Sequence, residues 1–133
     1  DLTNQFNSHK AERTQQTISV TRDLTLTGIQ TISTLPNRKI KAIFVHGLVP
    51  STKKVSQGFW AEQSVAYNVY SDPNANFYEG TNVYIVFSNN GAVDRTIGNV
   101  DAIREGTFDI LWSKSGAGAT GASVLRFLIF YHD

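Results

Sequence analysis

The sequence predicts an all-β protein: an antiparallel, jelly-roll-like β-sandwich with a short N-terminal helical stub. From Thr17 onward, apolar residues recur at every second position, which is the period of a β-strand. Turn-forming clusters interrupt this alternation at the spacing of about 8–12 residues that sandwiches show. No helical periodicity of ordinary length follows residue 16. Many short half-apolar strands bury their apolar sides most economically in two packed sheets.

The composition excludes several classes of function. The chain has 133 residues, of which 41% are hydrophobic and 17% charged, and its formal net charge is +1. This balance predicts one domain and no electrostatic attraction to nucleic acid or to an anionic membrane. No apolar run is long enough to insert into a bilayer. There is no cysteine, so disulfides and thiolate metal sites are excluded. We expect no cofactor.

The first residues differ from the rest of the chain. Residues 1–16, DLTNQFNSHKAERTQQ, are polar, and Leu2, Phe6 and His9 share one helical face. So narrow a stripe suits either a self-associating helix that trimerises the protein or a solvated linker. The chain has no methionine, which predicts a removed start or a piece of something longer, and the apparent entry in mid-helix favours the piece. We therefore assign 1–16 to a helical linker and 17–133 to a β-sandwich head domain.

The first half of the head domain alternates in several segments. TISV and LTLTGIQTIS predict one or two strands, with Gly28 as a bulge, and LPNRK predicts a turn. KIKAIFVHG predicts a strand with Ile40, Ala42, Phe44 and His46 on one side. VSQGFWAE and SVAYNVYS predict two further strands, and DPNANFYEG is dense in turn formers.

The second half contains the most apolar strands. NVYIVFSN is followed by NNG, which indicates a hairpin, and AVDRTIGNVDAI leads to the turn REG. TFDILWS places Phe108, Ile110 and Trp112 on one face, with Asp109 and Ser113 opposite. KSGAGATGAS predicts an exposed, flexible hairpin tip. VLRFLIFYH is apolar on both faces, which is typical of a central strand or a subunit contact. We expect eight or nine strands in total.

The residues that catalyse reactions or bind metals do not converge in the sequence. His9, His46 and His132 lack metal-ligand spacing. Ser115 precedes glycines in a hairpin tip, not in a phosphate loop. The carboxylates that a glycosidase would need are at positions expected to face solvent or lie in turns, so we predict that the chain is not an enzyme. These carboxylates are Asp94, Asp101, Glu105 and Asp109.

One segment combines aromatic rings with amide and carboxylate groups, as carbohydrate-binding sites do. The alternative is that the alternate aromatics in AYNVY pack inside the sandwich. The candidate ligand-binding residues are Trp60, Tyr67, Tyr70, Asp72, Asn74, Asn76 and Tyr78.

Four motifs in order resemble the C-terminal β-sandwich head domain of bacteriophage tail-fibre and head-fibre proteins. They are Gly28-Ile29-Gln30, Lys41-Ala42-Ile43, the strand from Gly106 to Trp112, and the final strand from Leu128 to Tyr131. The likeness covers residues 21–132, although the family's usual Gly-Phe-x-Pro turn is absent from LPNRKIKA. A weaker likeness is to H-type lectins.

The resemblance implies a function but no particular binding residue. A head of this kind is a homotrimer at the tip of a virion fibre, extracellular after release, and binds a host cell-surface polysaccharide or a wall polymer of the teichoic-acid type. The alternative is a structural head-fibre or decoration module that caps and registers a trimeric fibre without binding a receptor. A receptor binder should have a groove lined by the candidate aromatics, whereas a structural cap should bury them.

Overall fold

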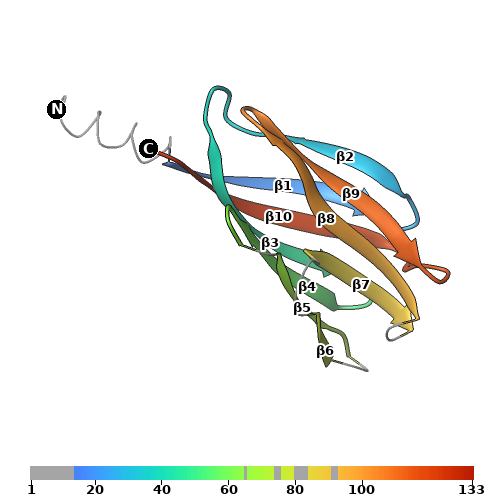
Figure 1. The fold of residues 1–133 in the computed structure, drawn as a ribbon. Coiled ribbons are helices and arrows are strands. Elements are labelled where there is room, and N and C mark those ends of the chain that lie inside the picture. The colour runs from blue at the N-terminus through green and yellow to red at the C-terminus, as the bar shows by residue number, and fades with distance from the viewer. Residues whose placement is uncertain (1–13, 65, 74–75, 80–83, 91–92) are drawn as a thin grey trace.

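The computed structural model describes residues 14–64, 66–73, 76–79, 84–90 and 93–133. These form ten strands in two antiparallel sheets, so the all-β prediction is confirmed and the chain has one or two strands more than expected (Figure 1). The six-stranded sheet has the order β1 (Gln15–Asp23), β10 (Ala122–Tyr131), β3 (Ile40–Val49), β4 (Lys54–Ala61), β5 (Tyr67–Ser71), β6 (Asn76–Glu79). The four-stranded sheet has the order β2 (Gly28–Ser33), β9 (Thr107–Ser115), β8 (Asp94–Arg104), β7 (Ile85–Asn90).

The core lies between the two sheets, where every second residue points inward. The predicted alternation of β9 is confirmed, because Phe108, Ile110 and Trp112 are all buried. The ring of Phe108 meets that of Phe127 on β10 edge to face, with centroids 5.4 Å apart. This aromatic pair joins the two sheets near the middle of the sandwich, and burial of such side chains supplies most of the folding free energy.

Along one side the sheets approach so closely that only a glycine fits. A Cβ atom added to Gly58 on β4 would lie 1.9 Å from the carbonyl oxygen of Tyr84, just before β7. The same carbonyl accepts a hydrogen bond from Asn68 Nδ2 at 2.8 Å, and Ser56 Oγ accepts one from the Val86 amide at 3.0 Å. These bonds attach the edge strand β7 to β4 and β5, and they satisfy backbone groups that would otherwise be buried without partners.

The connection between β9 and β10 differs from the prediction. The two strands lie in different sheets, so residues 116–121 cross the sandwich and do not form a hairpin tip. Ala119 is buried, and its amide donates to Thr96 Oγ1 at 2.8 Å, while Thr96 Oγ1 donates to the Leu24 carbonyl at 3.0 Å. Small residues are needed at Gly118 and Ala119 because this part of the loop packs against the core, so the predicted hairpin is wrong, although Gly116, Ala117 and Thr120 are exposed as expected.

Other local predictions are also corrected. The β2–β9 register is unbroken from Gly28, so this residue is no bulge; its φ of 95° places it where the chain turns into β2. A register shift in the β10–β3 pairing puts Ile40 in the core, whereas Ala42 lies on the outer side of the sheet, where its neighbours nearly cover it. The segment Asn76–Glu79, expected within a turn, forms β6.

The predicted helical stub falls almost entirely on residues 1–13, which lie outside the described residues, and β1 already begins at Gln15.

The apolar strand at the end of the sequence is central, as predicted. β10 pairs with β1 on one side and with β3 on the other. Leu125, Phe127 and Ile129 are buried on its inner side, whereas Leu128 and Phe130 are half-exposed on its outer side. Within the described residues, no helix is long and apolar enough to cross a membrane.

Candidate functional site

A cleft of about 510 Å³ opens at one end of the sandwich. One wall comes from the six-stranded sheet, at the start of β3 and the end of β4, and the other from the turn between β8 and β9. Its volume is within the range of small-molecule sites, about 300–1,000 Å³. The lining residues are Lys39, Ile40, Trp60, Glu62, Gln63, Ile103, Arg104 and Glu105.

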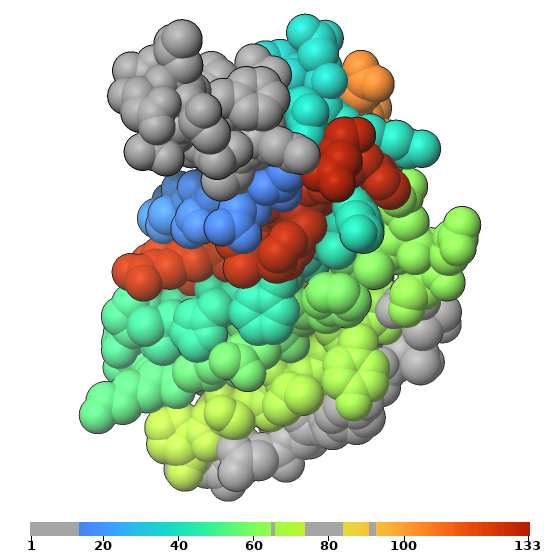
Figure 2. All heavy atoms as spheres, turned by 90° about the vertical axis from the view of Figure 1, so that its left-hand side faces the viewer, coloured from blue at the N-terminus to red at the C-terminus, as the bar shows by residue number. Residues whose placement is uncertain are grey.

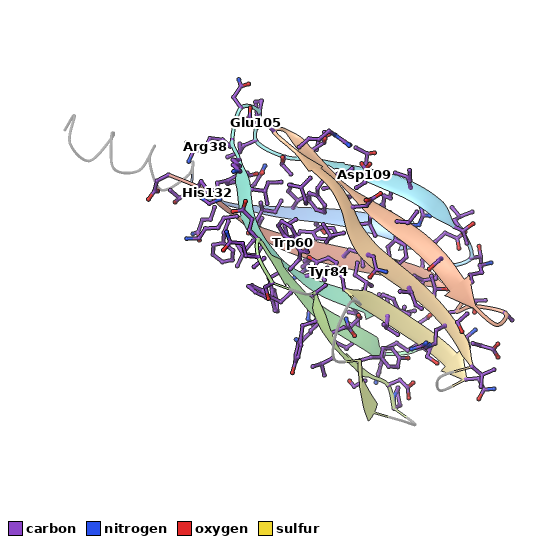
Figure 3. All side chains as sticks on the ribbon, viewed as in Figure 1. Arg38, Trp60, Tyr84, Glu105, Asp109 and His132 are labelled. Atoms are coloured by element: carbon purple, nitrogen blue, oxygen red, sulfur yellow. The ribbon has the colours of Figure 1, made fainter. Side chains whose placement is uncertain are left out.

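The apolar part of the cleft is formed around Trp60. This residue pairs with Ile43 across β3 and β4, so its indole has the inward parity of the core side chains. It is half-buried and packs against the core while one part lines the cleft. Figure 3 shows Trp60 between the sheets and Glu105 on the β8–β9 turn. An indole held in this way offers an aromatic surface whose position is fixed by packing.

The six-stranded wall carries a connected group of charges. Glu62 Oε1 contacts His132 Nε2, and Glu62 Oε2 lies 3.9 Å from Lys39 Nζ. Arg38 Nη2 donates to the His132 carbonyl at 2.6 Å. These contacts join the end of β4 to the residues just before β3 and just after β10, and they hold the Glu62 carboxylate at the cleft.

The opposite wall is positioned by Arg104. Its Nη2 lies 2.9 Å from Asp109 Oδ1, and its Nε donates to Thr107 Oγ1 at 2.9 Å. Thr31 Oγ1 also donates to Asp109 Oδ1, at 2.8 Å. Asp109 is 7% exposed, so the prediction that it faces solvent is wrong. A carboxylate is tolerated at this position because it receives a guanidinium and a hydroxyl.

Two polar side chains of the cleft remain available to a ligand. Gln63 and Glu105 are exposed, and neither is hydrogen-bonded to another described residue. Together with Lys39, Glu62 and Arg104 they give the cleft two cations, two carboxylates and an amide. A pocket of balanced charge with an aromatic wall suits a neutral ligand rich in hydroxyl groups better than a polyanion.

The structure separates the candidate residues predicted from the sequence. Tyr70 is buried, and its single hydroxyl proton lies between two acceptors, Asp72 Oδ2 at 2.9 Å and the Ser88 carbonyl at 3.1 Å. Burial is the main cause that raises the pKa of Tyr70, and the neighbouring Asp72 raises it further. Tyr67 is exposed, on the outer side of the six-stranded sheet. Trp60, Tyr67 and Tyr70 therefore do not line one groove.

The remaining candidates lie where less is described. Asn74 falls outside the described residues, and Asn76 and Tyr78 are placed on β6 by the backbone alone. Of the predicted set, Trp60 is the one that lines the cleft. Glu62, Gln63 and Arg104 were missed, and the available signal was that polar residues immediately follow or end apolar strands. Glu105 was considered only as a turn carboxylate. Among the described residues, no group of three metal-ligating side chains is present.

In comparisons with protein-family models, with curated proteins and with solved structures, nothing matches this chain.

Proposed function

We propose that the chain is the head domain of a virion fibre and that the Trp60 cleft binds a neutral polysaccharide of the host cell surface. The fibre assignment, the homotrimer and the jelly-roll character of the sandwich rest on the sequence resemblance. Glycan binding is supported by a separate observation: an aromatic side chain and unpaired polar groups line one open cleft. Polar groups that can pair with sugar hydroxyls, beside a ring that stacks on a sugar face, are what such ligands need.

The structural alternative, a head that only caps and registers a trimer, is favoured by a different observation. Tyr70 is buried and its hydroxyl is fully used by Asp72 and Ser88. The aromatic segment of β5 thus contributes partly to the core. The two functions differ in whether the cleft binds anything, so a direct binding experiment separates them.

The experiment measures tryptophan fluorescence during titration with neutral polysaccharides and, for comparison, a teichoic acid. Trp112 is 2% exposed and is not among the residues that line the cleft, so Trp112→Phe isolates the emission of Trp60. We expect a neutral polysaccharide to change the emission of Trp112→Phe and to leave that of Trp60→Phe unchanged. Binding of the teichoic acid alone contradicts the neutral-ligand assignment, and no response to any polymer favours the structural alternative.

Substitutions at the exposed polar residues test the site without disturbing the core. Each of Gln63→Ala and Glu105→Ala should weaken binding about five- to tenfold, since one hydrogen bond contributes about 1 kcal/mol. Ser113→Ala, at an exposed position on the outer side of β9 and away from both the cleft and the six-stranded sheet, is the control and should bind normally. If all three variants bind alike, the cleft is not the site.

A further inference from the structure

One side of the six-stranded sheet faces away from the other sheet and toward the viewer in Figure 2. We call this side the outer face. Its side chains lie in rows that cross the strands, and we define it by four rows of directly paired residues. The rows are Gln15, Phe130, Ala42 and Ala61; Thr17, Leu128, Phe44, Phe59 and Tyr67; Ser19, Arg126, His46, Gln57 and Val69; and Thr21, Val124, Leu48, Val55 and Ser71.

This face exposes large apolar side chains at directly paired positions on neighbouring strands. Phe44 is 37% exposed, Phe59 40%, and Tyr67 45%, and the three are successive partners across β3, β4 and β5. Leu48, Leu128 and Phe130 are half-exposed beside them. Scattered apolar residues are ordinary on protein surfaces, but a continuous apolar patch marks a surface that another molecule covers.

The polar residues of the face argue for a protein partner. Arg126 is the only permanently charged residue of the four rows, and the other polar groups are hydroxyls, amides and His46. Gln57 Nε2 donates to His46 Nδ1 at 3.2 Å. An apolar centre with few charges is the composition of the core of a protein interface, whereas an anionic membrane or a nucleic acid would require several cations.

The size of the face is close to what a stable association requires. Five strands about 4.8 Å apart, over about eight residues of 3.3 Å each, span roughly 600 Å² in projection. The ridged surface of the side chains exceeds its projection, and a specific interface buries about 800 Å² per partner. The row with His46 is mostly polar, and an apolar row lies on each side of it, so neighbouring copies around a shared axis are able to place apolar rows against apolar rows.

The point where the chain enters the domain favours a second copy as the partner. Thr14, the first described residue, lines a hollow of about 730 Å³ together with Phe59 and Phe130 of the outer face. Thirteen residues precede it, with the apolar stripe of Leu2, Phe6 and His9. If these segments associate as the fibre assignment implies, they hold several copies together at the edge of this face and raise its effective concentration.

We propose that the outer face is the contact between copies of this chain, with Phe44 and Phe59 at its centre. The inference deepens the fibre assignment of the proposed function, because it identifies the surface through which the copies associate. It does not depend on whether the Trp60 cleft binds a glycan.

The first test measures the mass of the full 133-residue chain in solution by sedimentation, from about 1 to 100 μM, since interfaces of this size give dissociation constants from micromolar downward. We expect the wild-type mass to be a multiple of the chain mass of 14.7 kDa. Phe59→Glu and Phe44→Glu should each reduce it to one chain, while circular dichroism shows an unchanged fold. Leu111→Glu is the matched control, because Leu111 is 44% exposed on the outer side of the other sheet.

The masses of these variants decide the proposal. An oligomer that is lost in the phenylalanine variants and kept in Leu111→Glu supports it. A wild-type protein of one chain mass, an oligomer that persists in both phenylalanine variants, or one that is lost equally in Leu111→Glu overturns it.

A second test uses the absence of cysteine, which lets one introduced thiol be labelled selectively. Gln57→Cys places a nitroxide on the outer face, and Ser113→Cys places one on the outer side of β9. Double electron–electron resonance measures the distance between the spin labels of two copies. We expect a short distance for Gln57→Cys and a longer one for Ser113→Cys; the reverse order overturns the proposal. Failure of glycan binding with these distances intact would refute the proposed function alone.

Discussion

The outward sides of the two sheets differ in how the side chains at their centres are satisfied. The outer face of the six-stranded sheet exposes Phe44 and Phe59, which have apolar neighbours on the adjacent strands but are open to solvent. On the outward side of the four-stranded sheet, Asp109 is nearly covered and receives Arg104 and Thr31. We call this Asp109 network the polar side; it is completed by contacts within the chain, although Ile29 and Leu111 beside it are exposed. The outer face is not completed by contacts within the chain. The stability of the protein should therefore depend on what covers this face.

The largest effect we expect concerns binding of a polymer with many repeated ligand units. Phe59→Glu should weaken binding of a long polysaccharide about 100-fold, because separated copies lose multivalent attachment. Binding of a short oligosaccharide to each site should not change, since the Trp60 cleft lies elsewhere. Surface-immobilised polymer and soluble oligosaccharide measure the two affinities. Equal loss for both ligands would contradict the separation of cleft and outer face.

The polar side offers the next largest effect. Asp109→Ala should lower the free energy of unfolding by about 2 kcal/mol, because it removes a nearly buried, charge-assisted partner of Arg104 and Thr31. Asp101 is paired with Asp109 across β8 and β9 but is exposed, so Asp101→Ala should change stability by less than about 0.5 kcal/mol. Urea unfolding measures both. Similar values for the two variants would show that the network stabilises nothing.

The dependence of stability on protein concentration distinguishes the two sides directly. If copies cover the outer face, the apparent stability of the wild type should rise by up to about 1.4 kcal/mol for each tenfold increase in concentration. Phe44→Glu should remove this dependence, and Asp109→Ala should keep it while lowering stability at every concentration. Thermal unfolding over a hundredfold concentration range is the measurement. A melting temperature that is constant for the wild type would refute self-association.

The smallest effect comes from the interior that both sheets share. Burial raises the pKa of Tyr84, so the unfolded chain loses this phenolic proton at a lower pH than the folded protein. Stability that is present below about pH 10 is therefore lost as the pH rises, by about 0.8 kcal/mol at pH 10.5 for one tyrosine. Tyr84→Phe should reduce that decline at any protein concentration. An unchanged decline in the variant would show that other groups cause it.

The sequence predicts strand parity well and long-range contacts poorly. The alternation of Phe108, Ile110 and Trp112 correctly indicated the buried side of β9, because parity is a local property of an extended chain. The loop around Ala119 was misjudged, since small residues suit an exposed tip and a tightly packed crossing equally well. The contact of Asp109 with Thr31 was also not predictable, because Thr31 is far away in the sequence and meets Asp109 only through the β2–β9 pairing.

The candidate site shows the same limit. Trp60 and Tyr70 both have inward parity, yet one lines a cleft and the other is covered. The difference arises because Trp60 lies near the open end of the sandwich, opposite the β8–β9 turn. That juxtaposition joins residues about forty positions apart in different sheets, which no local pattern indicates.

The position of β10 has a consequence for biosynthesis. Its residues Ala122–Tyr131 stand between β1 and β3, which do not pair with each other. While a ribosome is still adding the last strand, β1 has no neighbour in its sheet, and the nascent polypeptide must wait with apolar strands unpaired. Such distant pairing slows folding and leaves the newly made chain dependent on protection from aggregation until translation has passed Tyr131.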